Sequence, residues 1–159
     1  MKLQMASRLA IYAALELAAR PDEQLSAGEI GAKYGVSTHH LAKVLHGLRR
    51  AGLVRSVRGA GGGFRFAGNA KRVTLMDLIE LFERVGDANG AGFEPGEGTD
   101  IGGAVKIVLG EIDAITEATL RSISIATCLR LVDKTAGSRQ AERAEAAPDP
   151  AAAAEVESA

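Results

Sequence analysis

The sequence is poor in cysteine and has no long hydrophobic run. Its 159 residues include one cysteine, Cys128, which excludes an intramolecular disulfide framework and any metal site that needs several thiolates from one chain. No stretch approaches the roughly 18 uninterrupted apolar residues of a membrane span. The N-terminus has no basic segment followed by an apolar run and a cleavage site. We therefore expect a protein of the reducing cytoplasm that does not associate with membranes.

Aromatic residues are scarce as well. Tryptophan is absent, and aromatic residues make up 4% of the chain. The hydrophobic residues, 47% of the sequence, are therefore mainly Leu, Ile, Val and Ala, which is typical of helix-rich domains. A chain of this length supports one modest core with appendages.

Charge is distributed unevenly along the chain, although the net charge is only −1. Residues 1–72 hold 12 Lys and Arg against 4 Asp and Glu, whereas residues 73–159 hold 7 against 16. The two parts therefore carry +8 and −9. A basic block of this kind is typical of a protein that binds the phosphate backbone of nucleic acid, but an ordinary solvated surface would look the same.

Three segments carry residues that begin helices. Ser26 and Glu29 have the spacing of a capping box, in which the hydroxyl accepts from a backbone amide and the carboxylate reaches back. Thr74 and Asp77 repeat the arrangement. Ser37 can cap a third helix without the box, because a histidine stands where the acidic residue would be.

The first half of the chain has the pattern of a winged helix-turn-helix. Apolar residues at helical spacing predict helices over residues 2–19, 27–34 and 38–51, the last two separated by a tight glycine-containing turn. The β-prone runs 53–57 and 64–67 are joined by a glycine-rich loop, which predicts a hairpin. The expected fold is mainly α with a small β-hairpin wing.

The first domain is expected to end with a fourth helix over residues 75–85, so that residues 1–85 form the DNA-binding domain. Residues 86–99 are glycine-rich and acidic, and we expect a flexible loop there. Residues 137–159 are dominated by Ala and Glu and are expected to form a disordered tail.

Residues 100–136 are expected to hold a long helix and a short last helix near 126–134 that folds back on the body. The long helix carries a stripe with spacings of four and three, made of Ile101, Val105, Val108, Ile112, Ile115 and Thr119. Leu109, Leu120 and Ile123 widen this surface. A domain this small has little core in which to bury such a helix, so we expect it to pair with its symmetry mate in a homodimer while also covering its own domain. An internal core helix is the alternative.

The helix predicted from residue 38 has an apolar and a polar side. Its apolar side consists of Leu41, Val44, Leu45 and Leu48, and its polar side of Thr38, His39, Ala42, Lys43 and His46. Hydroxyl, ammonium and imidazole groups can contact phosphates or base edges. The polar side also fits an ordinary surface helix, but a wing directly after it favours insertion into the major groove of double-stranded DNA.

The predicted wing carries Arg55, Arg58 and Arg65 around a loop that includes Gly61 and Gly62. Glycines keep the backbone thin, so these arginines can approach the minor groove closely. A glycine-rich loop can also hold the phosphates of a nucleotide. This loop lacks the Lys-Ser/Thr pair of a phosphate loop, and no helix follows it immediately, so DNA is preferred.

Two stretches, MKLQMASRLAIYAALELA and VSTHHLAKVLHGLRRAGLVRSVRGAGGGFRFAGNAKRVTLMDLIELFE, closely resemble the Rrf2 family of regulators. That family includes an iron–sulfur cluster regulator and a nitric-oxide-sensing repressor. The resemblance covers residues 1–85 well, and the long helix and the TCLRLV segment more weakly. It implies a dimeric regulator, and the residues it places at the DNA are His39 and Ala42 opposite bases, Thr38, His40 and Lys43 nearby, and Arg58 in the minor groove.

The sequence departs from cluster-binding members of that family in the loop before the long helix. Those members carry three cysteines there, whereas residues 86–105 contain none. Iron binds such clusters through thiolates, so we expect neither an iron–sulfur cluster nor another metal cofactor. Cys128 could be a thiol sensor if it had a low pKa and were exposed, but apolar neighbours at helical spacing favour a small buried residue.

The expected function is that of a homodimeric transcription regulator, by preference a repressor, that binds a partly palindromic operator. Four alternatives stay open for the signal: a small-molecule effector held between the wing domain and the dimer helix, a protein effector, a reaction of Cys128, or no signal at all. The alternative is a module that binds a partner protein through its acidic half. No nucleophile with a base, carboxylate pair or metal-ligand spacing indicates an enzyme.

Overall fold

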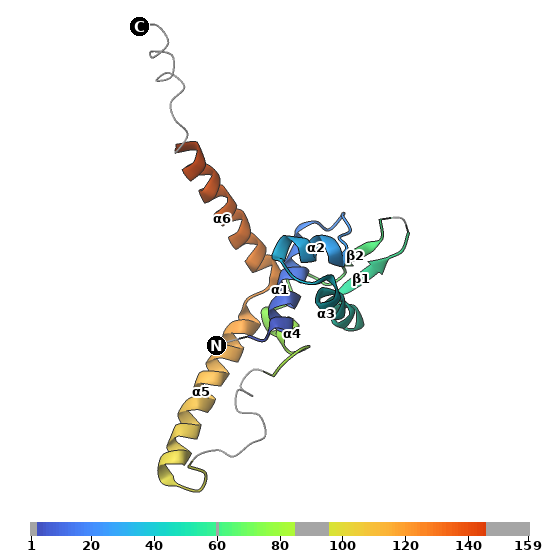
Figure 1. Ribbon diagram of the computed structural model, residues 1–159. Helices are drawn as coiled ribbons and strands as arrows, with labels where there is room; N and C mark the ends of the chain where they lie inside the picture. Colours follow the sequence, from blue (N-terminus) through green and yellow to red (C-terminus); the bar gives the residue numbers. More distant parts are fainter. Residues whose placement is uncertain (1–2, 60, 85–95, 146–159) are drawn as a thin grey trace, which may run out of the picture. The chain divides into compact units, whose positions relative to one another are not determined.

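The computed structural model describes residues 3–59, 61–84 and 96–145. Its elements are α1 (Met5–Ala19), α2 (Ala27–Tyr34), α3 (Thr38–Arg50), β1 (Val54–Val57), β2 (Gly63–Phe66), α4 (Leu75–Ile79), α5 (Asp100–Ser122) and α6 (Ile125–Glu145) (Figure 1). The chain divides into two compact units at Cys128. The first unit holds α1 to α5 and the start of α6, and the second holds the rest of α6. The predicted class, mainly α with a small hairpin, is confirmed.

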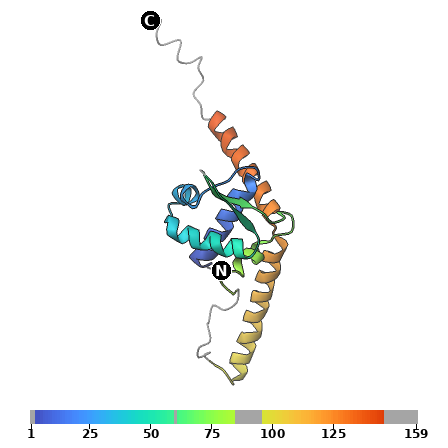
Figure 2. The ribbon, with the colours of Figure 1, turned by 90° about the vertical axis from the view of Figure 1, so that its right-hand side faces the viewer.

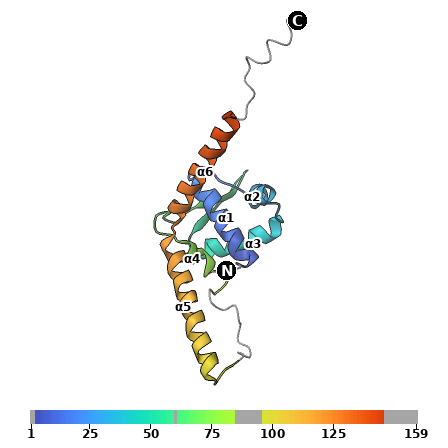
Figure 3. The same ribbon diagram turned by 90° about the vertical axis from the view of Figure 1, so that its left-hand side faces the viewer.

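Helix α1 lies at the centre of the first unit and packs against α3, α4 and β2. Its inward side includes Ala10, Ala13, Ala14 and Leu17, all fully buried. Alanine side chains are short, so the neighbouring elements pack close to the α1 backbone. Leucines of α3 and the Leu78–Ile79 pair of α4 complete the core around it. Figures 2 and 3, which show opposite sides, have α5 extending away from this group of helices.

The helix starts form as the sequence predicts. Ser26 accepts a hydrogen bond from the Glu29 amide at 3.1 Å, and its own amide donates to the Glu29 carboxylate at 2.7 Å. Thr74 and Asp77 make the same reciprocal pair at the start of α4. Ser37 caps α3 without a reciprocal partner, accepting from the His40 amide. These contacts are local, which is why the sequence is enough to predict them.

The hairpin is antiparallel, with a register that runs from Val54 opposite Phe66 to Val57 opposite Gly63. Leu25, just before α2, pairs with Phe64 on the free edge of β2 as an isolated bridge. Two backbone hydrogen bonds join Leu25 and Phe64, at 2.8 and 3.1 Å. The wing is therefore joined to the chain that enters the helix-turn-helix.

Two helices of the first unit, α1 and α4, have bounds that differ by more than one residue from the predictions. Helix α1 begins at Met5 rather than at residue 2, and Leu3 and Gln4 are not helical. Helix α4 ends at Ile79, so the prediction of a helix over residues 75–85 is wrong for residues 80–84, and residue 85 lies outside the described part of the chain. After Ile79 the chain turns: Phe82 lies against Gly47 of α3, and the Glu83 carboxylate accepts a hydrogen bond from the Gln4 amide at 3.0 Å. Tertiary contacts thus end this helix early.

Helix α6 is longer than the predicted short helix near 126–134 and continues to Glu145. The prediction of disorder from residue 137 is therefore wrong as far as Glu145, where Ala, Glu, Arg and Gln are good helix formers. Residues 146–159 lie outside the described part of the chain. The same holds for most of the predicted loop 86–99, of which only the last four residues are described, and the predicted domain boundaries at 85 and 99 stay predictions.

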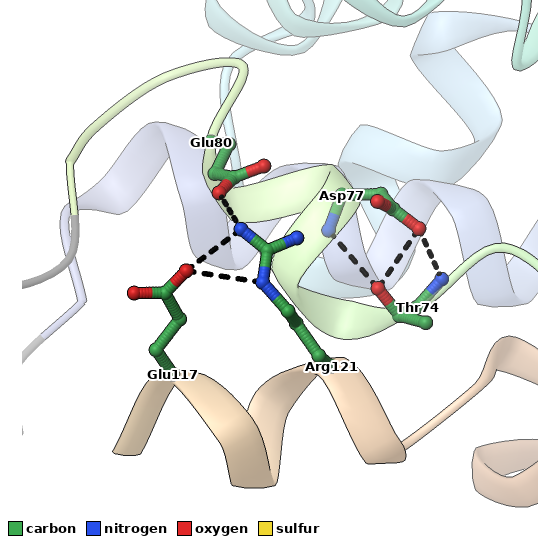
Figure 4. A network of polar contacts seen from close by, with 5 residues as sticks. All are labelled: Thr74, Asp77, Glu80, Glu117 and Arg121. Carbon is green, nitrogen blue, oxygen red and sulfur yellow. Dashed lines mark hydrogen bonds and ion pairs between the residues drawn. The ribbon is translucent and has the colours of Figure 1, made fainter. Parts of the chain in front are cut away.

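Within the first unit, the C-terminal end of α5 packs against α4. Leu120 packs with Met76 and Ile79 of α4 in a small cluster. Arg121 Nη2 binds the Glu80 carboxylate at 2.5 Å and the Glu117 carboxylate at 2.8 Å (Figure 4). These contacts fix the end of α5 beside α4. Among the described helices, none is long and apolar enough to cross a membrane.

Candidate DNA interface

Helix α3 presents the polar face that the sequence predicts. Its buried side chains are Leu41, Val44, Leu45 and Leu48, each at most 4% exposed. The predicted contact residues are all exposed, namely Thr38, His39, His40, Ala42 and Lys43, as is His46. The face consists of hydroxyl, imidazole, methyl and ammonium groups over the first three turns of the helix. These are the groups that reach base edges and phosphates when a helix lies in the major groove.

The N-terminal end of α3 is favourable for a phosphate. Helix α3 has no acidic residue in its first turn, and its two arginines, Arg49 and Arg50, lie in its last turn. Free amides and the helix dipole give such an end positive character. Ser37 uses one of the amides, and exposed Thr38 stands beside the others.

A tight turn between α2 and α3 depends on Gly31, which the sequence analysis did not single out. A Cβ atom at this position would lie 2.7 Å from the Val36 carbonyl oxygen. The Gly31 carbonyl accepts from the Val36 amide at 2.9 Å, and Gly35 takes a positive φ of 64° to close α2. The sequence feature that could have identified Gly31 is its position as a glycine near the end of the first helix of a helix-turn-helix. Gly31 sets the close approach of the two helices and thereby the direction of α3.

The wing brings three predicted arginines to one hairpin. Arg55 and Arg65 are paired directly across the two strands, and Arg58 is exposed at the turn. Like charges in opposite positions destabilise a bare hairpin, and a bound anion removes this penalty. Within the described residues no carboxylate forms an ion pair with any of the three, and the buried Arg65 Nε has no hydrogen-bond partner. The hairpin thus carries positive charge that the described protein groups leave unneutralised.

Glycine is required at the wing for geometric reasons. A Cβ atom on Gly62 would lie 2.7 Å from the Val57 carbonyl oxygen, and one on Gly63 would lie 2.6 Å from the Leu25 carbonyl oxygen. Gly59 and Gly61 have positive φ angles of 122° and 80°. Gly61 and Gly62 are therefore required by the geometry of the turn, and their predicted contact with DNA stays a prediction.

Helix α3 and the wing lie next to each other in the first unit. Helix α3 packs against β1, and the Leu53 amide donates to the Leu48 carbonyl oxygen at 3.0 Å. Figure 1 shows the hairpin beside α3. The structure thus places the two sets of predicted contact residues on adjacent elements.

A buried carboxylate joins α1 to α2, and the sequence analysis missed it. Glu16, 8% exposed, forms an ion pair with Lys33 and accepts a hydrogen bond from the Tyr34 hydroxyl at 2.5 Å. Arg20 lies 3.5 Å from the same carboxylate, and Tyr34 stacks on Tyr12 with ring centroids 4.8 Å apart. Burial by itself would raise the pKa of Glu16, but the hydrogen bonds from Lys33 and Tyr34 outweigh it and lower the pKa. This cluster fixes the first helix of the helix-turn-helix on α1.

Cys128 does not have the surroundings of a reactive thiol. It is partly buried near the start of α6, and burial raises its pKa. A raised pKa lowers the thiolate fraction that oxidation requires. The structure therefore offers no support for the thiol-sensor alternative.

The residues of the chain do not fit an iron–sulfur cluster. A cluster needs several thiolates, and the sequence supplies one. In the described part of the chain, no group of three or more His, Cys, Asp or Glu side chains is placed to hold a metal ion. The three histidines lie on α3, on the face that the DNA-binding prediction uses.

Comparison with known proteins gives the family. The family model "Rrf2: Iron-dependent Transcriptional regulator" matches residues 3–131. The chain belongs to the Rrf2 family. BadM of Rhodopseudomonas palustris, named as an HTH-type transcriptional regulator, is 52% identical over 134 residues, which cover 84% of each chain. The HTH-type transcriptional regulator IscR of Cereibacter sphaeroides is 35% identical over 101 residues, 60% of this chain and 65% of its own.

Solved structures agree with this assignment. T. potens IscR superimposes with a TM-score of 0.68 at 26% identity and covers 85% of this chain and 90% of its own. CymR of B. subtilis, the global cysteine regulator, has a TM-score of 0.69 at 24% identity and covers 82% and 98%. The Rrf2 family assignment and the winged-helix fold are confirmed, and with them a role in DNA-binding transcription regulation.

Proposed function

We propose that this Rrf2 protein is a homodimeric repressor that reads a partly palindromic operator with α3 and the β1–β2 wing. The observation that carries the proposal is the exposed polar and basic face of α3 next to a hairpin with three arginines. Membership of a family of transcriptional regulators supports double-stranded DNA as the partner. The protein would work in the cytoplasm, where a bacterial chromosome lies.

In this proposal the two elements contact different parts of the DNA. The residues assigned to the major groove are Thr38, His39, His40, Ala42 and Lys43. Arg58 enters the flanking minor groove, where a thin glycine turn permits close approach. Arg55 and Arg65 bind backbone phosphate, which neutralises their mutual repulsion.

Helix α5 supports the homodimer. Its predicted stripe is exposed over most of its length, with Ile101 79%, Ile112 53% and Ile115 67% accessible. Large apolar side chains gathered in such number on a single helix mark an interaction surface. A two-fold symmetric pairing through this helix would bring a second copy of α3 into the assembly, as binding to two operator half-sites requires.

The signal would come from a small molecule or a partner protein. The single cysteine and the absence of thiols from residues 86–105 support regulation without an iron–sulfur cluster. A cluster-free regulator would still bind DNA through the same two elements.

The test begins with selection of duplexes from a random DNA library by the purified full chain. The enriched duplex is then used in gel retardation with Arg58→Ala and, as a control for loss of one positive charge, with Arg139→Ala on the exposed surface of α6. We expect Arg58→Ala to abolish specific retardation and Arg139→Ala to keep it. Unchanged binding by Arg58→Ala would contradict the role given to the wing. A selection that enriches no sequence would favour the partner-protein alternative.

A further inference from the structure

The described part of the wing turn, residues 58, 59, 61 and 62, has little support of its own. The strands on either side are four residues each, and a two-stranded hairpin is marginally stable in water. Within the turn, the Gly62 amide donates to the Gly59 carbonyl oxygen at 2.9 Å. Gly59 and Gly61 both have positive φ, and glycine gains the most backbone freedom when such a turn opens. The position of Arg58 therefore depends on what holds the turn.

Gln24 makes a hydrogen bond to this turn from outside the hairpin. Its side-chain amide Nε2 donates to the Gly61 carbonyl oxygen at 2.5 Å. Within the described ranges, no other hydrogen bond reaches residues 58, 59, 61 or 62 from outside the two strands. The contact joins residues 37 positions apart in the sequence.

Gln24 belongs to a segment that is itself firmly placed. The next residue, Leu25, pairs with Phe64, and the close approach of its carbonyl oxygen requires glycine at position 63. Ser26 then caps α2. Three consecutive residues thus connect the wing turn, the wing strand and the first helix of the helix-turn-helix.

We propose that Gln24 is a positioning residue of the DNA interface: it holds the wing turn so that Arg58 meets the minor groove while α3 lies in the adjacent major groove. This inference rests on the proposed function. Gln24 acts through the wing and needs no contact with DNA. A turn that is ordered before binding loses less conformational entropy when DNA binds, so the entropic cost of binding is smaller.

The deciding variant is Gln24→Met, which keeps the length of the side chain and removes the amide donor. Gln140→Met, at an exposed position of α6, is the matched control. We expect Gln24→Met to bind the selected duplex about fivefold more weakly, as for loss of one hydrogen bond, with an unchanged thermal midpoint. The control should bind as the wild type does. Equal affinity of Gln24→Met and wild type would overturn the inference.

Footprinting at saturating protein separates positioning from general damage. With Gln24→Met, hydroxyl-radical protection of the flanking minor groove should weaken, while protection of guanine N7 in the major groove should remain. Loss of both protections together would overturn the positioning role. If the wild-type chain selects no duplex, the proposed function fails and this inference with it; if the wild type binds and Gln24→Met matches it in affinity and footprint, the inference alone fails.

Discussion

Gly31 and Gly28 lie in the same short helix but have different surroundings. A Cβ atom on Gly31 would meet the Val36 carbonyl oxygen at 2.7 Å, whereas one on Gly28 would find its nearest neighbour at 3.8 Å. The first distance requires the backbone between α2 and α3 to move, and the second is an ordinary contact. The turn that directs α3 thus requires a residue without a Cβ atom at position 31.

We expect Gly31→Ala to lower the free energy of unfolding by about 1–3 kcal/mol, the usual cost of an added group in a packed place. Gly28→Ala should not lower it, because alanine favours helix over glycine. Denaturant unfolding of both variants measures the difference. Equal stability of the two would show that the turn can relax at no cost.

Glu16 is the buried acidic residue among the described side chains, and its pKa is lowered from 4.5. The folded state therefore favours the carboxylate more than the unfolded state does. By linkage, the stabilisation is fully present above the unfolded pKa and is lost as pH falls through the lower folded pKa.

We expect Glu16→Gln to unfold at a lower temperature than wild type near neutral pH, and the gap between the two to narrow as pH falls from about 7 to about 3. The physical reason is that protonated Glu16 resembles glutamine. Thermal unfolding followed by circular dichroism across this range checks it. Glu111→Gln, at an exposed position of α5, serves as the charge-matched control. A gap that stays constant with pH would contradict the ion-pair explanation.

At the scale of elements, α5 combines an attached end with an exposed remainder. Leu120 and Arg121 fix it to α4, while the stripe from Ile101 to Ile115 has no cover within the described residues. An amphipathic helix of this kind has its apolar side satisfied by another subunit more readily than by water.

We expect Ile112→Glu to convert the proposed dimer to monomer, because it places a charge in the centre of the apolar surface. Specific DNA binding should fall with it, since two half-sites would no longer be held together. Analytical ultracentrifugation gives the oligomeric state. Ala114→Glu adds the same charge on α5 outside the stripe and should leave the dimer intact. A dimeric Ile112→Glu would place the subunit interface elsewhere.

At the scale of the whole molecule, the separation of charge between the two parts of the chain is the dominant electrostatic feature. The net +8 of residues 1–72 coincides with the residues that form α1 to α3 and the hairpin. Phosphates bound by this part release counterions, so binding should depend steeply on salt.

We expect affinity for the selected duplex to fall about a thousandfold between about 50 and about 200 mM monovalent salt, as for some six phosphate contacts per complex. Fluorescence anisotropy over this range measures the slope. A flat response would contradict binding through the basic half of the chain.

The proposed lack of an iron–sulfur cluster concerns the whole chain, because a set of ligands can come from any part of it. We expect protein purified without oxygen to contain no bound iron and to have no visible charge-transfer bands. One absorbance spectrum and an iron assay are sufficient. Bound iron with such bands would overturn the cluster-free proposal.

Features that arise from neighbours along the chain can be predicted from the amino-acid sequence. Capping boxes at Ser26 and Thr74, glycine at the end of α2 and the apolar spacing of α3 act within a few residues, so the sequence predicts where these helices begin and which side of α3 is polar. The same spacing predicts the stripe on α5. The extension of α6 to Glu145 also follows from local sequence, because the segment is rich in helix-forming residues. The prediction of disorder there was wrong because it relied on the low hydrophobicity of the segment.

Contacts between residues far apart in the chain became visible in the folded structure alone. Phe82 packs against Gly47, and the Glu83 carboxylate accepts a hydrogen bond from the backbone amide of Gln4. These two contacts end α4 at Ile79. Glu16 becomes a buried ion-pair centre only when α2 packs on α1, and Gln24 reaches the wing only after Leu25 pairs with Phe64. The physical reason is the same in each case: these interactions join residues far apart in the chain, and their energies depend on distances that no local pattern specifies.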